Sequence, residues 1–408
     1  MSDAGSWPAA PSPREQPIAH WVRSAEELRA LADALRGNAA VALDTESDSL
    51  HHYKEKVCLI QLATEAGAAT LIDPLAFNDL SALAPLCADP AIVKIFHAAD
   101  YDLTCLKRDF GFHFANVFDT MIASRTLGLT EIGLDAVLLK YFEVLPGKSR
   151  QRDDWSERPL SPAQEAYAIT DVRYLIPLRE RLLADLRAMG REAWVLEECE
   201  AVAGIPAGGR IFDPDGFFWL KGARQLQGQG LAVLRELYRA RERWAEAADR
   251  PVFKVLGNET LVHLAQDRPR NPQALLKIRG CSPYVLRRHG DGIFEAIAKG
   301  EATPEVELPA YPESPRRHVP GIVQRRAERL KKWREAAAPR YGLDPGILLP
   351  QRLIDRLAEE GPADLAALAR LDGFRRWRAQ TFGPEILACM PDPPAAGGPV
   401  RRRRRRRR

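Results

Sequence analysis

The first part of the chain alternates short apolar runs with helical patterns. The segment SAEELRALADALRG (24–37) spaces its apolar residues as a helix does, starts at a Ser that can cap it and stops at a Gly. Three strand-like runs follow, VALDTES (41–47), VCLIQLAT (57–64) and AATLIDP (68–74). The residues EAG between the last two have the composition of a hairpin turn.

Strands and helices then alternate. The stretch DLSALAPLCAD predicts a helix, VKIFHA (93–98) a strand and DLTCLKRDFG (102–111) a helix that ends at its Gly, and further helices continue to about residue 200. Strands first and alternation afterwards predict an α/β domain in which helices pack on the faces of one sheet.

The second half of the chain is helical and repeats itself. Superposing its two halves places Trp244 over Trp333 and Leu275 over Leu365, with offsets of 89 and 90. Offsets that agree this closely predict two copies of one small helical domain, joined by the Pro- and Arg-rich segment 303–321.

These patterns divide the chain into six segments. We predict a disordered arm at 1–20, the α/β domain at 21–200, a linker at 201–225, a first helical domain at 226–305, a second at 320–390, and a disordered Arg-rich tail at 391–408. Both ends contain too few large apolar side chains to bury a core.

The net charge of the chain depends on its last eight residues. The full sequence has 59 Lys+Arg against 55 Asp+Glu, a net charge of +4, but residues 401–408 are all Arg. Without them 51 Lys+Arg face 55 Asp+Glu, a net charge of −4. Attraction for a polyanion would therefore come from local basic patches or from the tail.

The composition also bears on the compartment. The six cysteines are scattered, without a C-x-x-C pair or a cluster at zinc spacing, as is typical of a reducing compartment. The start, MSDAGSWPAAPSPREQP, lacks the basic and apolar regions of a signal peptide, and no run of 18 apolar residues occurs. We expect a cytoplasmic protein with no membrane span, and no feature indicates an obligate protein partner.

Candidate chemistry first appears inside the strand 41–47. Asp44 and Glu46 lie two residues apart, so the strand places both carboxylates on one face. Like charges held together repel, and burying them without a partner is costly. A strand end that faces solvent is the simpler interpretation of this pair alone, and a bound cation is the alternative.

Two later segments add acids and a phenol. In KIFHAADYDLTCLK a strand gives way to a helix at Asp100 and Asp102. In SPAQEAYAITDVRYL the Ser, Pro and Gln predict a capped helix on which Tyr167 and Asp171, four residues apart, share a face. Mg²⁺ prefers carboxylate ligands, and two such ions can promote phosphodiester hydrolysis. The sequence therefore predicts a two-metal phosphodiester site.

The order and the sequences of these segments resemble those of the ribonuclease D family of DEDD-type 3′–5′ exonucleases. LDTE, HAADYDL and YAITDVRYL match its three exonuclease motifs, and FDTMIASRTLG and DDWSERPLSPAQEAYA resemble its connecting segments. The resemblance implies a ribonuclease H-like α/β exonuclease domain, a mixed sheet flanked by helices, and two divalent metal ions, Mg²⁺ or Mn²⁺. The catalytic residues that it implies are the metal-binding acids Asp44, Glu46, Asp102 and Asp171, together with Tyr167, which marks the tyrosine subclass.

The resemblance also implies roles. Asp44, Glu46 and Asp171 would hold the metal that binds the attacking water, Asp44 would bridge to a second metal, and Asp102 would act through water. Tyr167 would orient the water, because a phenol with a pKa of about 10 is a poor free base. Asp102 is chosen over Asp100 because a Leu follows it, and Asp100 stays open as the alternative.

The helical repeats resemble the HRDC domain found in ribonuclease D and in RecQ-type helicases. The first copy carries WAEAADRPVFKV, LVHLA and LLKIRG, and the second is a degenerate copy. The resemblance implies that these domains help to grip nucleic acid. VLRRHG (285–290) and FRRWRAQ (374–380) combine basic and aromatic side chains that can contact phosphates and bases. The alternative is that Phe374 and Trp377 are core residues and the arginines are solvated.

Other residues keep two interpretations. His97 is either a hydrogen-bonded core histidine or a catalytic group, and Asp119 is either a helix cap or a site residue. A basic stretch near the third motif either contacts substrate phosphates or forms a solvated loop; it comprises Lys148, Arg150, Arg152 and Arg158.

We therefore expect a 3′–5′ exoribonuclease that matures the 3′ ends of tRNA precursors and trims other structured RNAs, releasing nucleoside 5′-monophosphates. One alternative is an exonuclease that acts mainly on DNA. Another is an inert RNA-binding scaffold, which the presence of all four acids and the tyrosine disfavours. No substrate-binding residue is singled out.

Overall fold

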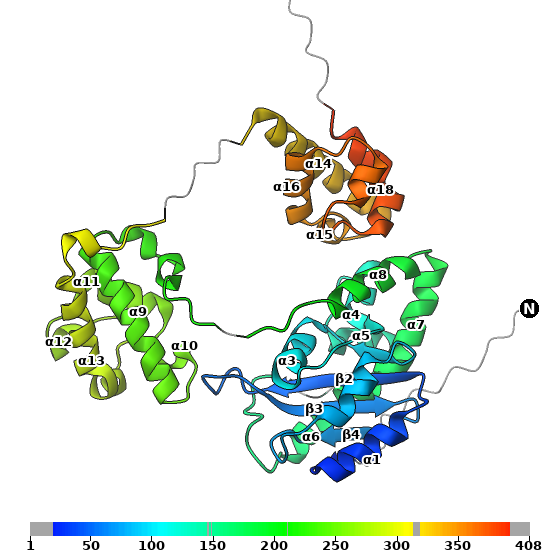
Figure 1. Ribbon diagram of the computed structural model, residues 1–408, viewed down its shortest axis with the longest axis horizontal. Helices are drawn as coiled ribbons and strands as arrows, with labels where there is room; N and C mark the ends of the chain where they lie inside the picture. The colour runs from blue at the N-terminus through cyan, green and yellow to red at the C-terminus, as the bar shows by residue number, and fades with distance from the viewer. Residues whose placement is uncertain (1–18, 145–146, 148, 210, 313–318, 392–408) are drawn as a thin grey trace, which may run out of the picture.

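The computed structural model describes residues 19–144, 147, 149–209, 211–312 and 319–391 (Figure 1). The predicted arm 1–20, apart from its last two residues, and the tail 391–408, apart from its first, lie outside the described residues.

A six-stranded mixed sheet forms the centre of the first domain. Its strands are β1 (His20–Val22), β2 (Ala40–Ser47), β3 (Val57–Thr64), β4 (Ala69–Ile72), β5 (Val93–Phe96) and β6 (Val117–Asp119). The strand order is β1-β4-β3-β2-β5-β6; β2, β3 and β4 run antiparallel, whereas β1, β5 and β6 run parallel to their neighbours. The mixed sheet expected from the sequence is confirmed, but β1 and β6 were not predicted.

Helices cover both faces of this sheet (Figure 1). They are α1 (Ala25–Leu35), α2 (Ala84–Ala88), α3 (Asp100–Phe110), α4 (Thr120–Leu127), α5 (Leu134–Phe142), α6 (Pro162–Arg173), α7 (Leu175–Ala188) and α8 (Glu192–Ala203), with a 3₁₀ turn, η1, at Ser81–Leu83. The helix starts expected from the sequence are present: Ser24 accepts a hydrogen bond from the Glu27 amide, and Ser161 and Gln164 form a capping box.

Two helical domains follow. The first contains α9 (Gln229–Ala247), α10 (Val252–Val255), α11 (Asn258–Asp267), α12 (Pro272–Leu275) and α13 (Pro283–Glu301), and the second contains α14 (Gly321–Tyr341), α15 (Pro345–Leu348), α16 (Gln351–Glu360), α17 (Leu365–Ala369) and α18 (Arg376–Ala388). Three 3₁₀ turns, η2 (Gly216–Trp219), η3 (Ala223–Gln225) and η4 (Glu305–Glu307), accompany the first domain. Phe217, Phe218 and Ala223 are buried in its core, so the second half of the expected linker 201–225 packs with this domain. Of the helices in the described segments, none has the length and apolarity that a membrane span needs.

The two helical domains repeat one another in a register that differs from the predicted one. α11 and α16 begin at Asn258 and Gln351, and α13 and α18 begin at Pro283 and Arg376, a constant offset of 93. Leu275 is fully buried whereas Leu365, its predicted equivalent, is 48% exposed. The repeat itself was correct, but the predicted offsets of 89 and 90 were wrong by about one helical turn.

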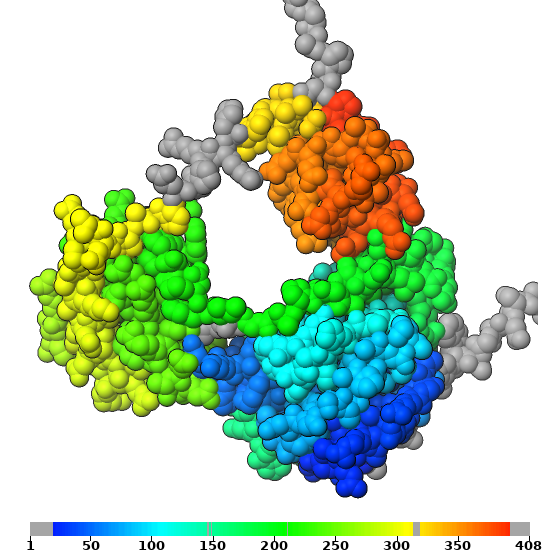
Figure 2. All heavy atoms as spheres, viewed as in Figure 1, coloured from blue at the N-terminus to red at the C-terminus, as the bar shows by residue number. Residues whose placement is uncertain are grey.

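The first helical domain contacts the connection between β2 and β3. The carboxylate of Asp249 accepts a hydrogen bond from the Tyr53 amide (3.1 Å), and its second oxygen lies 2.7 Å from Nδ1 of His52. The hydroxyl of Tyr53 donates to Glu242 (2.7 Å). Figure 2 shows this domain, in green and yellow, meeting the α/β domain at one side of an open space.

The second helical domain docks on α8. The indole of Trp377 stacks on that of Trp194 with 4.4 Å between the ring centroids. Glu198 accepts hydrogen bonds from the Trp377 indole (3.1 Å), from Arg378 (2.7 Å) and from Arg375 (3.1 Å). The segment FRRWRAQ therefore makes an interdomain contact. Phe374 and Trp377 are core residues, as the second interpretation held, but its other half was wrong: Arg378 is buried, and Arg375 and Arg378 pair with Glu198 instead of being solvated.

The backbones of the two domains also approach closely beside this contact. Gly128 ends α4 with a φ of +86°, and a Cβ atom built on it would lie 2.1 Å from the carbonyl oxygen of Gly342. Only glycine can occupy this position without moving the domains apart. Arg191 donates hydrogen bonds to the carbonyl oxygens of Thr126 and Tyr341 and so links both sides.

We predict that Glu198→Ala weakens this docking. The substitution removes three charged or indole hydrogen bonds and leaves Arg378, which is buried, without its carboxylate. The expected cost is on the order of 2–3 kcal/mol of docking free energy. Small-angle scattering should show a larger radius of gyration, and limited proteolysis should release the second helical domain faster.

Glu200→Ala is the matched control, because Glu200 lies on the same helix and its side chain contacts, within the described part of the chain, only the exposed Arg376, at 3.9 Å. Equal behaviour of the two variants would contradict the assignment.

Candidate functional site

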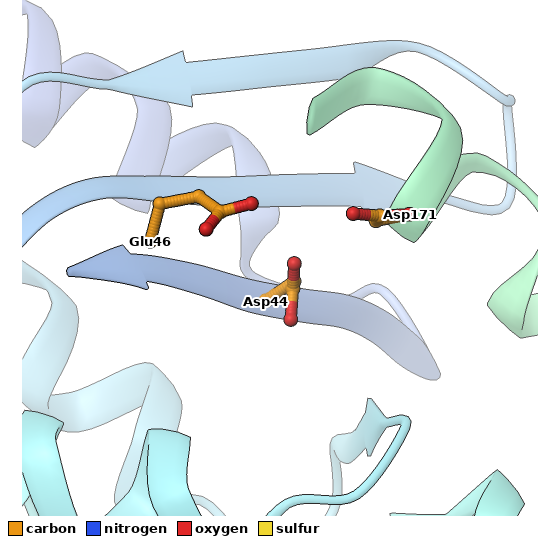
Figure 3. A group of neighbouring side chains, drawn as sticks. All are labelled: Asp44, Glu46 and Asp171. Atoms are coloured by element: carbon orange, nitrogen blue, oxygen red, sulfur yellow. The ribbon is translucent and has the colours of Figure 1, made fainter. Parts of the chain in front are cut away.

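Three carboxylates from two elements meet at one point on the sheet. β2 supplies Asp44 and Glu46 on one face, and α6 crosses that face and supplies Asp171 (Figure 3). One carboxylate oxygen of each residue lies within 4.8 Å of the others. These atoms form a group that could hold a metal ion, since carboxylates are the ligands of hard divalent cations.

Asp102 lies in the same cavity but is held from the other side of β2. Its carboxylate accepts a hydrogen bond from the hydroxyl of Thr45, the residue between Asp44 and Glu46. It is buried near the start of α3, whereas Asp100 is exposed and lies outside the cavity. The position of Asp102 therefore favours it over Asp100 as the fourth acid.

Asp119 shapes the turn that presents Asp102. Its carboxylate caps α4 by accepting hydrogen bonds from the amides of Met121 (2.7 Å) and Ile122 (3.2 Å), which agrees with its interpretation as a helix cap. The same carboxylate accepts hydrogen bonds from the amides of Ala98 (3.1 Å) and Ala99 (2.8 Å) at the β5–α3 turn. Ala98 has a φ of +63°, and these bonds help to hold it in that uncommon conformation.

Tyr167 projects from α6 into the cavity, one turn before Asp171. Its ring packs against the fully buried Trp155, with 6.2 Å between the ring centroids. The Trp155 indole is itself fixed by a hydrogen bond to the carbonyl oxygen of Arg150 (3.2 Å). This packing limits where the phenol can point.

The acids raise one another's pKa. Burial first, and then repulsion from Asp171, raises the pKa of Asp44 well above its usual range. The pKa of Glu46 is raised by burial and by Asp44 and Asp171, and that of Asp171 is raised to about 7, chiefly by burial. Burial and the neighbouring acids also raise the pKa of Tyr167, so the phenol stays protonated at neutral pH. Positive charge would relieve this repulsion, so the site fits divalent cations.

A cavity of about 700 Å³ contains all five predicted site residues. Several other residues that line the cavity were not singled out from the sequence: Ser49 and Leu50 from the β2–β3 connection, Tyr101, Asp135, Ser149 and Gln151. Asp135 was detectable only as an acid in the first turn of a predicted helix, a common surface feature.

His97 has features of both of its interpretations. Its Nδ1 lies 2.9 Å from the hydroxyl of Thr120, its ring lines the cavity, and burial lowers its pKa to about 4. The ring is therefore neutral.

Two of the four residues of the predicted basic stretch are used within the protein, and Arg152 is exposed. Arg158 binds both carboxylate oxygens of Asp73 (2.7 and 2.8 Å), Arg150 pairs with Asp153 (3.2 Å), and Lys148 lies outside the described residues.

Comparisons with known proteins agree with this architecture. A family model described as a 3′–5′ exonuclease matches residues 19–187, and the HRDC domain model matches residues 230–297 and 323–390. Ribonuclease D of Gluconacetobacter diazotrophicus is 34% identical over 90% of this chain and 91% of that protein. Ribonuclease D of Pseudomonas paraeruginosa is 31% identical over 91% of this chain and 97% of that protein.

A solved structure is similar over nearly the whole chain. The crystal structure of Escherichia coli RNase D, described as an exoribonuclease involved in structured RNA processing, matches with a TM-score of 0.66 and 27% identity, covering 91% of this chain and 98% of that one. The molecule is thus a hydrolytic 3′–5′ exonuclease that carries two HRDC domains. The chain belongs to the ribonuclease D family.

We predict that the metal-free protein loses stability as the pH rises. Because the pKa of Asp171 is about 7 in the folded state and about 4 in an unfolded chain, the folded state binds more protons between these values. The stabilisation is complete below about pH 4 and is lost as the pH rises through about 7. In EDTA, the calorimetric midpoint of the exonuclease domain should fall between pH 5 and 8, by roughly 2–4 °C for each kcal/mol lost.

Asp171→Asn should reduce this fall, and Mg²⁺ should suppress it in the wild type. Asp33→Asn, at an exposed site on α1, should leave it unchanged. A wild-type midpoint that rises with pH over this interval would contradict the prediction.

We also predict that the two neighbouring acids of α3 differ in their effect on hydrolysis. Asp102→Asn should lower kcat about 100-fold or more, because its carboxylate lies in the cavity and holds Thr45. Asp100→Asn should change kcat by less than about threefold, as most surface substitutions do. Steady-state rates on one labelled oligonucleotide test both, and a reversed order of the two effects would assign the fourth acid to Asp100.

Proposed function

We propose that the protein is a metal-dependent 3′–5′ exoribonuclease that releases nucleoside 5′-monophosphates and matures the 3′ ends of tRNA precursors. The convergence of Asp44, Glu46 and Asp171 in one cavity with Asp102 and Tyr167 carries this proposal. The family to which the chain belongs and its 3′–5′ exonuclease domain support it.

The four acids are the proposed ligands of two divalent cations, Mg²⁺ or Mn²⁺. Asp44, Glu46 and Asp171 are close enough to share one cation, and Asp102 contributes from the opposite side of β2, through water. When bound, such cations supply a Lewis acid that stabilises the charge developing on the phosphate and the leaving 3′ oxygen. The four acids would hold the two cations in place and set the distance between them.

Tyr167 is the proposed orienting group for the attacking water. Its raised pKa keeps the phenol protonated, so it positions water through its hydroxyl and does not serve as a free base. Its packing against Trp155 fixes the direction of that hydroxyl relative to Asp171.

RNA is the proposed substrate, because the relatives are named ribonuclease D and the similar solved structure is described as acting in structured RNA processing. Arg287 and Arg288 in the first HRDC domain are exposed, and we propose that they contact RNA phosphates. DNA as the main substrate is the second candidate, since nothing in the acid cluster itself selects the sugar.

The domain limits and the compartment belong to the same proposal. We place the exonuclease domain at 21–200 and the HRDC domains at 226–305 and 320–390, with the second half of the segment 201–225 packed against the first HRDC domain, and we propose that the protein is cytoplasmic. The six cysteines, all free thiols, are consistent with a reducing compartment.

The proposal predicts that trimming of a 3′-extended tRNA precursor depends on the acids, the tyrosine and a divalent cation. Asp44→Ala should abolish trimming, because it removes a proposed ligand of the cations. Tyr167→Phe keeps the ring but loses the hydroxyl, and should lower kcat by about 100-fold or more. EDTA should stop the wild type, and Mg²⁺ or Mn²⁺ in excess should restore it. Gel analysis of the products over time measures all of these.

Matched RNA and DNA single strands separate the two candidate substrates. Faster degradation of DNA would replace the ribonuclease proposal with a deoxyribonuclease one. Full activity of Asp44→Ala would remove the acid cluster from the mechanism, and binding of RNA without hydrolysis would indicate a scaffold.

A further inference from the structure

A buried amide lies beside the acid cluster. Gln61 belongs to β3, and its side chain is fully buried. Neither its Nε2 nor its Oε1 has a hydrogen-bond partner among the residues that the structure describes. A buried amide without a partner is costly, so such a group in a folded protein calls for an explanation.

The register of the sheet places this amide next to Asp44. Gln61 lies directly opposite Asp44 on β2 and directly opposite Leu71 on β4. Opposed residues of antiparallel strands project to the same face, with Cβ atoms about 4.5–5.5 Å apart. Gln61 therefore shares the face that carries Asp44 and Glu46, under α6.

The rest of this face around Gln61 is apolar. Leu59 and Ala63, two residues away on β3, and Leu71 on β4 belong to the hydrophobic core between the sheet and the helices. An apolar side chain of equal length would fill the same space without a polar cost. An amide at this position therefore suggests a polar partner, and the β2–β3 register makes Asp44 the nearest acid.

The chemistry of the two groups is complementary. An amide nitrogen offers two N–H donors, and an ionised carboxylate offers acceptor sites on both oxygens. A carboxylate that binds a cation does so in its ionised form, so Asp44 in the proposed metal-binding role would present acceptor oxygens to the amide that lies opposite it on β3.

We propose that Gln61 is a positioning residue for the metal-binding acids: its Nε2–H group donates a hydrogen bond to the ionised carboxylate of Asp44 and fixes the orientation of that carboxylate toward the cations. The inference rests on the proposed metal-dependent function. Outer partners that orient a ligand in this way typically change metal affinity by about 10–100-fold.

Mn²⁺ titration calorimetry of the full chain tests this role. Gln61→Met keeps the length of the side chain and removes the donor, and it should bind Mn²⁺ about 10–100-fold more weakly than the wild type. Leu62→Met is the matched control, because Leu62 is the next residue of β3, is equally buried and faces the opposite side of the sheet. It should bind Mn²⁺ as the wild type does.

Two further measurements distinguish orientation from packing. In EDTA, Gln61→Met should be at least as resistant to urea as the wild type, because Met fills the same space without burying an amide that has no hydrogen-bond partner among the described residues. The lowered kcat of Gln61→Met at limiting Mn²⁺ should rise toward the wild-type value when Mn²⁺ is raised 100-fold. A packing defect would lower the stability in EDTA and would not respond to metal.

The outcomes separate the two proposals. Wild-type Mn²⁺ affinity in Gln61→Met, with reduced affinity in Asp44→Asn, overturns the role of Gln61 and leaves the metal-dependent function standing. A loss of stability of Gln61→Met in EDTA also overturns it. If the wild type binds no Mn²⁺ and Asp44→Asn changes nothing, the proposed function fails and this inference fails with it.

Discussion

Repulsion between carboxylates on one face of β2 is the constraint on which the site depends. Asp44 and Glu46 are fixed there by the strand, and α6 adds Asp171 against them. Folding brings these charges together against their mutual repulsion, and the surrounding structure holds them: the Thr45 hydroxyl binds Asp102, the capping box fixes the start of α6, and Asp119 holds the turn before α3. The protein thus maintains a place where a cation is favourable before any cation arrives.

The features that the sequence predicted well are those fixed by local chemistry. The caps at Ser24 and Ser161, the apolar strand 57–64 and the alternation of Asp44 and Glu46 are each set by a few neighbouring residues. β1 and β6 are three residues long and gain their definition from partners, β4 and β5, that are distant in sequence. A strand of three residues is too short to show the alternation of apolar and polar residues by which strands are recognised in a sequence.

The repeat register shows a related limit. A shift by one helical turn keeps apolar residues on the same face, so two registers about four residues apart score nearly alike by pattern. The structure separates them through a shared contact. Arg241 donates to the carbonyl oxygen of Leu256 (3.0 Å) and Arg334 to that of Leu349 (3.1 Å), each pair 93 residues from its counterpart. The same internal bond thus marks equivalent positions in both copies.

The side chains that act over long sequence distances were the least predictable part of the site. The sequence favoured Asp102 over Asp100 only through the Leu that follows it, whereas the structure favours Asp102 through a contact with Thr45, which is 57 residues away. Gln61 could be recognised in the sequence as a polar residue within the apolar strand VCLIQLAT. Its position beside Asp44 follows only from the pairing of β2 with β3. The FRRWRAQ segment had the composition of a nucleic-acid contact, yet Arg375 and Arg378 pair with Glu198 of α8. A charge pattern alone does not say whether a basic side chain binds a phosphate or a carboxylate of its own chain.

The indole pair at the docking surface has a spectroscopic consequence. Two indoles stacked at 4.4 Å couple their excited states, and the coupling disappears when the rings separate. Trp194 belongs to the α/β domain and Trp377 to the second HRDC domain, so circular dichroism of the unlabelled protein carries a signal specific to their association. The chain therefore contains its own optical reporter of whether that domain is docked or free.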